Sequence, residues 1–180
     1  MSCVSAYTVS GCVSAALAGA LCGAVGKWLE VARWPFSPFS VLAALALLLA
    51  ARELGVIHFG LPERKRQSEK VWANRFGLLG ASWMWGFHIG LAFVTRITYG
   101  GFYVLALAVV VIGDPWYGAL LFTIYWIGRA LPVWSAPLLL WLSRDRQEMP
   151  AIIAYNPRLF RPLAAATLLW LAVLLVWSAR

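Results

Sequence analysis

Residues 76–113, FGLLGASWMWGFHIGLAFVTRITYGGFYVLALAVVVIG, decide the fold, because they are apolar for 38 residues apart from His88 and Arg96. A straight helix of that length would reach roughly 57 Å, whereas the hydrocarbon core of a membrane is about 30 Å thick. The segment must therefore break. Paired glycines beside β-branched residues at 95–101 (TRITYGG) mark the natural place. We expect one membrane span made of two half-helices.

The composition of the whole chain indicates the same class of protein. Of its 180 residues, 62% are hydrophobic and 12% are charged, whereas soluble domains have about 45–50% apolar and about 25% charged residues. This composition excludes a soluble globular enzyme, a disordered chain and a nucleic-acid-binding module, despite the net charge of +8. We expect the lipid bilayer, and no nucleic acid, as a partner.

Four further apolar stretches complete an expected all-α fold, a polytopic membrane helix bundle of five transmembrane spans in one domain. The expected spans cover residues 5–28, 39–61, 76–113 (broken near 95–101), 116–142 and 163–179. A six-span alternative would make 102–113 a span by itself. At roughly 18 Å that segment is too short to cross alone, so we favour five spans.

The basic residues predict the orientation of these spans. Loops 62–75 and 143–162 contain nine of the 15 lysines and arginines. Both loops lie on one side only if 76–113 crosses once, and the positive-inside rule assigns that side to the cytoplasm. We therefore expect a cytoplasmic N-terminus and an extracytoplasmic C-terminus.

The first expected span contains small residues at regular spacing and two of the three cysteines. Small residues recur every four positions at Gly11, Ala15, Gly19 and Gly23. Such a ridge lets another helix approach closely, and we favour internal packing over a partner interface. Cys12 and Cys22 lie about 15 Å apart along this helix and on different faces, so they cannot be joined to each other. We favour packing roles for both cysteines and keep redox thiols as the alternative.

Ionisable residues inside apolar spans are costly and often mark function. Estimated depths predict that Glu53 pairs with Arg129, or with Arg52 if that side chain extends toward the interface. Arg96 is expected to bond carbonyls freed at the break, or to present a cation to a redox partner or anionic ligand. His58 and His88 differ in estimated depth, so a shared metal or haem site is disfavoured, and we predict no cofactor or metal. The candidates for function are Arg96, Glu53, Arg129, Arg52 and His88.

Four segments in order resemble the membrane thiol-disulfide electron carriers, which are the transmembrane proteins of cytochrome c biogenesis and disulfide reduction. Residues 6–26 (AYTVSGCVSAALAGALCGAVG) resemble the glycine-rich second helix of that family. Residues 60–66 (GLPERKR) resemble the end of its third helix with the basic loop. Residues 86–113 are similar to its broken fourth helix, and 118–140, with glycine and then Leu-Pro, to its fifth.

The resemblance covers roughly residues 6–142 and has two departures. The family exchanges thiolates between a cysteine in its first helix and one in its broken fourth helix. This chain begins at the equivalent of the second helix and has Arg96 near the second cysteine position. It is therefore either a divergent member with another role, or a chain that lacks a helix because the gene start is misplaced.

The resemblance implies a multi-pass protein of the bacterial inner membrane. Its implied role is that of an accessory in assembly or redox maturation of an extracytoplasmic redox protein, such as methylamine dehydrogenase. The implied partner is a cytochrome, a thioredoxin-like protein or a subunit of a membrane complex.

Two other functions stay open at this point. One is a small-solute or ion transporter with its site at the broken helix. The other is a structural subunit of a membrane redox complex that binds through the glycine ridge. No signature of nucleophilic catalysis, phosphate binding or zinc binding stands out, so we expect no conventional enzyme active site.

Overall fold

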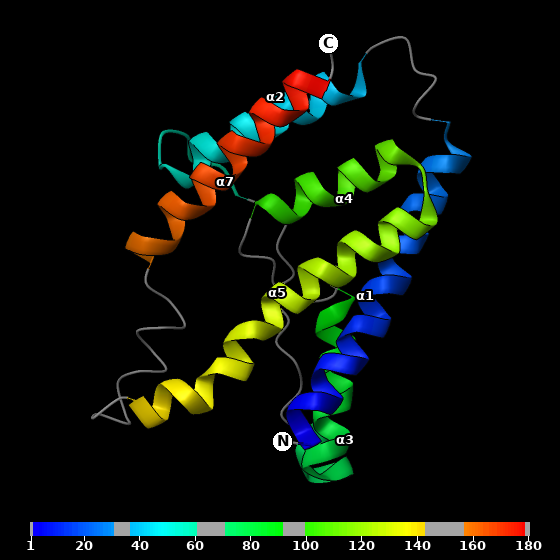
Figure 1. Ribbon diagram of the computed structural model, residues 1–180, viewed down its shortest axis with the longest axis vertical. Coiled ribbons are helices and arrows are strands. Elements are labelled where there is room, and N and C mark those ends of the chain that lie inside the picture. The colour runs from blue at the N-terminus through cyan, green and yellow to red at the C-terminus, as the bar shows by residue number, and fades with distance from the viewer. Residues whose placement is uncertain (1, 31–36, 61–70, 92–99, 143–156, 179–180) are drawn as a thin grey trace.

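The computed structural model describes residues 2–30, 37–60, 71–91, 100–142 and 157–178. Within these ranges the chain forms six helices and no strands, so the all-helical expectation is confirmed there (Figure 1). The stretch 76–113 contributes two separate helices, and residues 92–99 between them lie outside the described ranges. The helices are α1 (Ser2–Trp28), α2 (Pro38–Glu53), α3 (Val71–Gly90), α4 (Gly101–Ile112), α5 (Pro115–Leu142) and α7 (Pro157–Ser178).

Helix α1 is the centre of the larger part of the bundle and packs against α3, α4 and α5. Gly86 of α3 lies against Tyr7 of α1, and Gly90, one turn later, lies against Gly11. The residue numbers rise together on the two helices, so α3 runs parallel to α1 at this contact. Both contacts bring backbone against backbone, which glycine allows because it has no Cβ.

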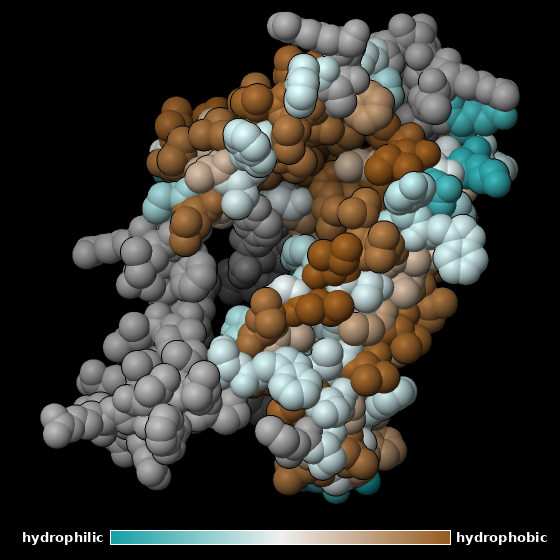
Figure 2. All heavy atoms as spheres, in the orientation of Figure 1, coloured by the Kyte–Doolittle hydropathy of each residue, from teal (hydrophilic) through white to brown (hydrophobic). Residues whose placement is uncertain are grey.

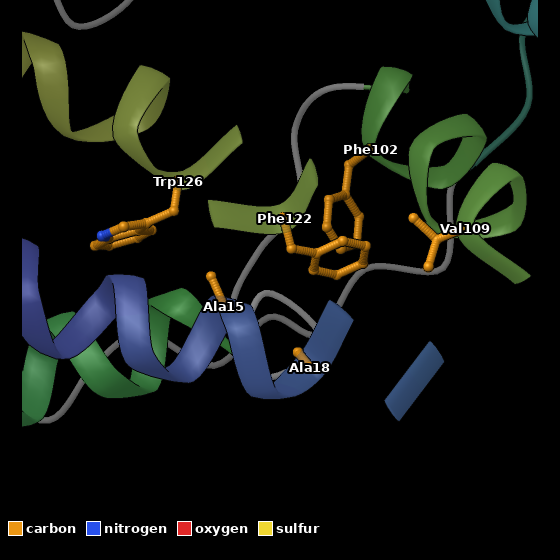
Figure 3. Packing of buried hydrophobic residues seen from close by; sticks show 6 residues of the cluster. All are labelled: Ala15, Ala18, Phe102, Val109, Phe122 and Trp126. Atoms are coloured by element: carbon orange, nitrogen blue, oxygen red, sulfur yellow. The ribbon is translucent and has the colours of Figure 1, made fainter. Parts of the chain in front are cut away.

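Helix α4 continues along α1 beyond the end of α3 and is buried on two sides. Phe102 at the start of α4 contacts Phe122, which lies at the level of Gly19, whereas Val110 near its end lies against Gly26. Helix α4 therefore runs in the same direction as α1 and α3. Phe102 and Val109 join a cluster with α1 and α5 (Figure 3). Val104 joins a second cluster with α2 and α7. Helix α4 therefore connects the two parts of the bundle.

Helix α5 returns antiparallel to α1. Gly118, near its start, lies against Gly19, and Trp126, two turns later, lies against Gly11. The Trp126 Nε1–H group also donates to the Thr8 carbonyl oxygen at 3.0 Å. These contacts fix the register of α5 on α1 along at least three turns.

Helices α2 and α7 form the second part of the bundle and run antiparallel side by side (Figure 1). Their contact repeats every three or four residues, as one face of a helix requires. The buried residues at this contact are Ala46, Leu49 and Ala50 of α2 with Leu168 and Ala172 of α7.

Helix α2 ends at Glu53, eight residues before the end expected for the 39–61 span. Gly55 has a φ of +78°. Its N–H donates to the Arg52 carbonyl oxygen at 2.9 Å, and the Val56 N–H donates to that of Ala51 at 2.9 Å. This pair of bonds is a Schellman motif, in which a left-handed glycine terminates a helix. The apolar composition of residues 39–61 gave no indication that the helix ends just before Gly55.

Helix α3 changes direction at Gly77, where the backbone is non-helical, with φ 66° and ψ 175°. The rings of Trp72 and His88 lie 5.5 Å apart, whereas their Cα atoms would be roughly 24 Å apart along a straight helix. The chain therefore folds back at Gly77, and only residues 78–90 run along α1. This reversal was not expected within the apolar stretch.

Many large apolar side chains are exposed on the outside of the bundle, and Figure 2 shows apolar areas on one face of it. Ser10, Ser14 and Glu53 are buried. Among the described helices, Ser2–Trp28 alone has both the length and the composition to cross a membrane, while two other apolar helical segments, Gly101–Ile112 and Arg161–Trp177, are shorter. Exposed apolar residues occur along each described helix and include Val9, Val13, Leu17, Leu21, Val41, Leu78, Leu107, Ile124, Leu131, Trp170 and Val173.

Candidate functional site

A largely buried ion pair lies at the end of α2. Arg52 Nη1 donates to Glu53 Oε1 at 2.8 Å, and the Glu53 side chain is only 9% exposed. Arg52 Nε also donates to the Phe59 carbonyl oxygen at 3.0 Å. The guanidinium carbon lies 5.7 Å from the centre of the Phe59 ring. Arg52 and Glu53 are consecutive residues at the end of α2, and the turn that follows brings Phe59 back onto Arg52.

Glu53 lies beside the N-terminus of α4. A methyl group placed on Gly100 would stand 3.6 Å from Glu53 Oε1 and 3.4 Å from Leu49. The first N–H groups of a helix lack acceptors within the helix and carry partial positive charge. The carboxylate of Glu53 therefore complements the start of α4. Arg96, the candidate expected at the break, lies outside the described residues.

Glu53 pairs with Arg52, which was the alternative partner expected from the sequence, and not with Arg129. Helix α2 packs on α7 and α4, whereas α5, which contains Arg129, packs mainly on α1. The depth estimate failed because it assumed that α2 continues to residue 61. Arg129 instead lies half-buried with its guanidinium carbon 6.0 Å from the centre of the Tyr125 ring.

The two histidines have different surroundings. His88 Nδ1 is buried and has no hydrogen-bond partner, and the ring meets Trp72 edge to face. His58 is exposed in the segment after α2. Across the described ranges, no three His, Cys, Asp or Glu residues gather as they would around a metal ion.

All three cysteines of the chain lie on α1 and are free thiols. Cys12 and Cys22 are half-buried and pack beside the cluster that joins α1, α4 and α5. Residues nine or more positions apart on one helix are separated by about 13 Å or more. No two of these thiols can therefore form a disulfide while α1 stays helical.

The small-residue ridge of α1 is an internal packing surface. Gly11, Gly19 and Gly23 each lie so close to α5 or the turn before it that a methyl group would overlap it. Ala15 is 2% exposed within the same interface. The ridge is therefore already covered by the chain itself and is not available to another subunit.

A second close interface, between α1 and α3, was missed in the sequence. Ser10 and Ser14 pack against Gly86 and Gly90, where added methyl groups would overlap the serine hydroxyls. Both hydroxyls donate to carbonyl oxygens of their own helix at 3.1 Å. The sequence does contain a signal for this interface, because Gly86 and Gly90 are four residues apart and therefore lie on one face of α3.

The Arg52–Glu53 pair is the strongest candidate site because it places a buried carboxylate between a cation and a helix N-terminus. Such a carboxylate can exchange its arginine partner for another cation. Comparison with known proteins found no matching family model, no matching curated protein and no matching solved structure. The function must therefore be inferred from the residues and their geometry.

Proposed function

We propose that the chain is an integral membrane protein with five spans, a cytoplasmic N-terminus and an extracytoplasmic C-terminus. The observation that carries this proposal is the distribution of side chains. Leu17, Leu21 and Leu131 are exposed, whereas Ser10 and Ser14 are 0% exposed. Water would disfavour an apolar outer surface of this extent. In a bilayer it is the expected arrangement, with small and polar residues at helix contacts.

The directions of the helices support five spans over six. In the five-span arrangement, α1 and the broken span run parallel and α5 runs antiparallel to both. The contacts of Gly86, Gly90 and Val110 along α1, and of Gly118 on Gly19, have these directions. A six-span arrangement would require α4 to run opposite to α3.

The topology is tested by fusing alkaline phosphatase, which is active only outside the cytoplasm, at four positions. We expect activity after residue 34 and after residue 180, and none after residue 66 or residue 150. Activity after residue 150 would favour the six-span arrangement, and recovery of the unfused chain in the soluble fraction would overturn the membrane proposal.

Within the membrane, we propose that the chain is an accessory in the assembly or redox maturation of an extracytoplasmic redox protein. Support comes from the layout, because the stretch that resembles the broken fourth helix of the electron-carrier family forms two helices, α3 and α4, which both pack on the glycine-rich α1. The three cysteines on one helix cannot form a dithiol pair, so any thiol exchange belongs to a partner. The role is therefore accessory.

The test of this role is purification from native membranes in mild detergent, with stoichiometric companions identified by mass spectrometry. We expect a cytochrome, a thioredoxin-like protein or a subunit of a redox complex. In a strain without the chain, the extracytoplasmic client should accumulate in an immature form. Isolation of the chain alone, together with normal maturation in that strain, would contradict the proposal.

The Arg52–Glu53 pair favours a second candidate function, transport of a small solute or ion. A carboxylate that is 9% exposed beside the start of a half-helix resembles the substrate and ion sites of transporters with discontinuous helices. In that case, Glu53→Gln should abolish flux in vesicles while the protein remains folded. An accessory protein should show no flux at all, and its client should mature normally with Glu53→Gln if folding is intact.

A further inference from the structure

Arg129 is an inward-facing cation on α5. It lies three residues after Trp126 and seven after Phe122, which are each 1% exposed, so the three residues share one face of the helix. The opposite face contains Ile127 and Leu131, which are 46% and 60% exposed. Arg129 therefore points toward α1 rather than toward the apolar outer surface.

Among the described residues, those around Arg129 supply aromatic rings and a hydroxyl group but no counter-charge. Its guanidinium carbon lies 6.0 Å from the Tyr125 ring centre. The Tyr7 ring of α1 lies 5.1 Å from the ring of Trp126, which is on the same face of α5 as Arg129 and one turn before it. No carboxylate of the described residues forms an ion pair with Arg129, and Glu53 pairs with Arg52 on α2 instead. A cation inside an apolar bundle is costly unless an anion or several hydrogen bonds compensate it.

The position along α1 places Arg129 near the cytoplasmic end. Trp126 Nε1 donates to the Thr8 carbonyl oxygen at 3.0 Å, and Trp134 Nε1 donates to Thr8 Oγ1 at 2.9 Å. Arg129 lies between these two tryptophans on α5, so it stands close to the level of Thr8. That level is about 9 Å from Ser2 at the start of α1, which is within reach of the headgroup region.

We propose that Arg129, together with Tyr7, binds an oxyanion of the phosphate type at the cytoplasmic end of the α1–α5 interface. A guanidinium presents a planar fork of donors that matches phosphate oxygens, and a tyrosine hydroxyl adds one more donor. The phosphate belongs either to an anionic lipid headgroup or to a soluble anion. The assignment of this site to the cytoplasmic side rests on the proposed topology, whereas the contacts of Arg129 and Tyr7 do not.

The experiment measures thermal unfolding of the purified protein in neutral detergent with sodium phosphate or sodium chloride at equal ionic strength. A parallel series adds phosphatidylglycerol or phosphatidylcholine. We expect phosphate or phosphatidylglycerol to raise the unfolding midpoint above its control. Stabilisation by free phosphate indicates a soluble anion, and stabilisation by phosphatidylglycerol alone indicates a headgroup.

Three variants assign the effect to the site. Arg129→Gln should bind the stabilising anion about tenfold more weakly, as expected for one charged hydrogen-bonding group. Tyr7→Phe keeps the ring that packs on Trp126 and should bind about threefold more weakly. Arg161→Gln removes the same charge from an exposed position on α7 and should bind like the unmodified chain.

The proposal is overturned if neither anion stabilises the unmodified protein beyond its control, or if Arg161→Gln weakens binding as much as Arg129→Gln. If Arg129→Gln does not fold, unchanged binding in Tyr7→Phe and in Arg129→Lys, which replaces the fork with a point charge, overturns it instead. Fractionation of the cells before purification tests membrane association separately, so a failed anion site and a failed membrane proposal are distinguishable.

Discussion

Gly19 of α1 and Gly118 of α5 meet backbone to backbone, and a methyl group on either one would overlap the carbonyl of the other. The contact is reciprocal, so neither side has a flexible side chain that could move aside. Two turns along, Gly11 makes a similar contact, but with the indole ring of Trp126. The α1–α5 interface is therefore closest where it has no side chains at all.

This contact predicts that Gly19→Ala lowers the free energy of unfolding by on the order of 2–3 kcal/mol, because the helices must separate to admit the methyl group. Thermal unfolding in detergent, followed by circular dichroism, measures the effect. Gly128→Ala is the matched control, since a methyl group there meets nothing within 4 Å. It should leave stability unchanged or raise it by about 0.5–1 kcal/mol, because alanine favours the helix. Equal effects of the two substitutions would show that the close contact is absent.

The hydrogen bond from Trp126 Nε1 to the Thr8 carbonyl oxygen predicts that Trp126→Phe is destabilising. The indole is 1% exposed, so the loss of the bond and of packing volume should cost about 2 kcal/mol. Trp134→Phe removes a bond to Thr8 Oγ1 from a side chain that is 43% exposed, and should cost less than about 1 kcal/mol. The same unfolding measurement separates the two, and a larger effect at Trp134 would contradict this order.

The helical class and the glycine ridge could be predicted because each rests on a local pattern that packing reinforces. Gly11, Ala15, Gly19 and Gly23 follow one face of α1, and any helix that packs there must approach that face. The expectation that residues 76–113 are not one helix rested on length alone, because a helix of 38 residues would be longer than a membrane is thick, and the described residues form two helices there.

The sequence left two partners open for Glu53, Arg129 and Arg52, and it did not predict the helix ends. Depth estimates for Glu53 and Arg129 assumed a helix to residue 61, whereas Gly55 ends α2 with a left-handed backbone. A glycine in an apolar stretch can end a helix, as Gly55 does, or allow a close helix contact, as Gly86 does. It can also have neither role, as at Gly128. The backbone geometry and the neighbours of each glycine distinguish these cases.

The reversal at Gly77 predicts that a side chain at this position would strain the backbone without colliding with neighbouring atoms. With φ 66° and ψ 175° the residue lies where non-glycine residues are strongly disfavoured, while a methyl group there would meet nothing within 4 Å. Gly77→Ala should therefore cost about 1–3 kcal/mol and weaken the Trp72–His88 contact, which a shift in tryptophan fluorescence would report. Gly60→Ala, also in open space but without a positive φ, should be nearly neutral. Equal effects at the two positions would argue against the reversal.

The Arg52–Glu53 pair predicts strongly non-additive substitutions. Glu53→Gln leaves Arg52 without its carboxylate at a site where the side chains are 21% and 9% exposed. The loss should cost about 2–3 kcal/mol, at the low end for a broken buried pair because Arg52 keeps the Phe59 carbonyl and some access to solvent.

Arg52→Gln should cost at least as much, since it leaves the more buried carboxylate beside the start of α4 with only the helix N-terminus to compensate it. The double variant Arg52→Gln/Glu53→Gln should recover about 1 kcal/mol or more relative to the sum of the single changes, because no uncompensated charge remains. The unfolding midpoints of the unmodified chain, the two single variants and the double variant complete this double-mutant cycle. Additive effects would mean that the two side chains do not interact, and α4 would then owe its position to the contacts of Phe102 and Val104 alone.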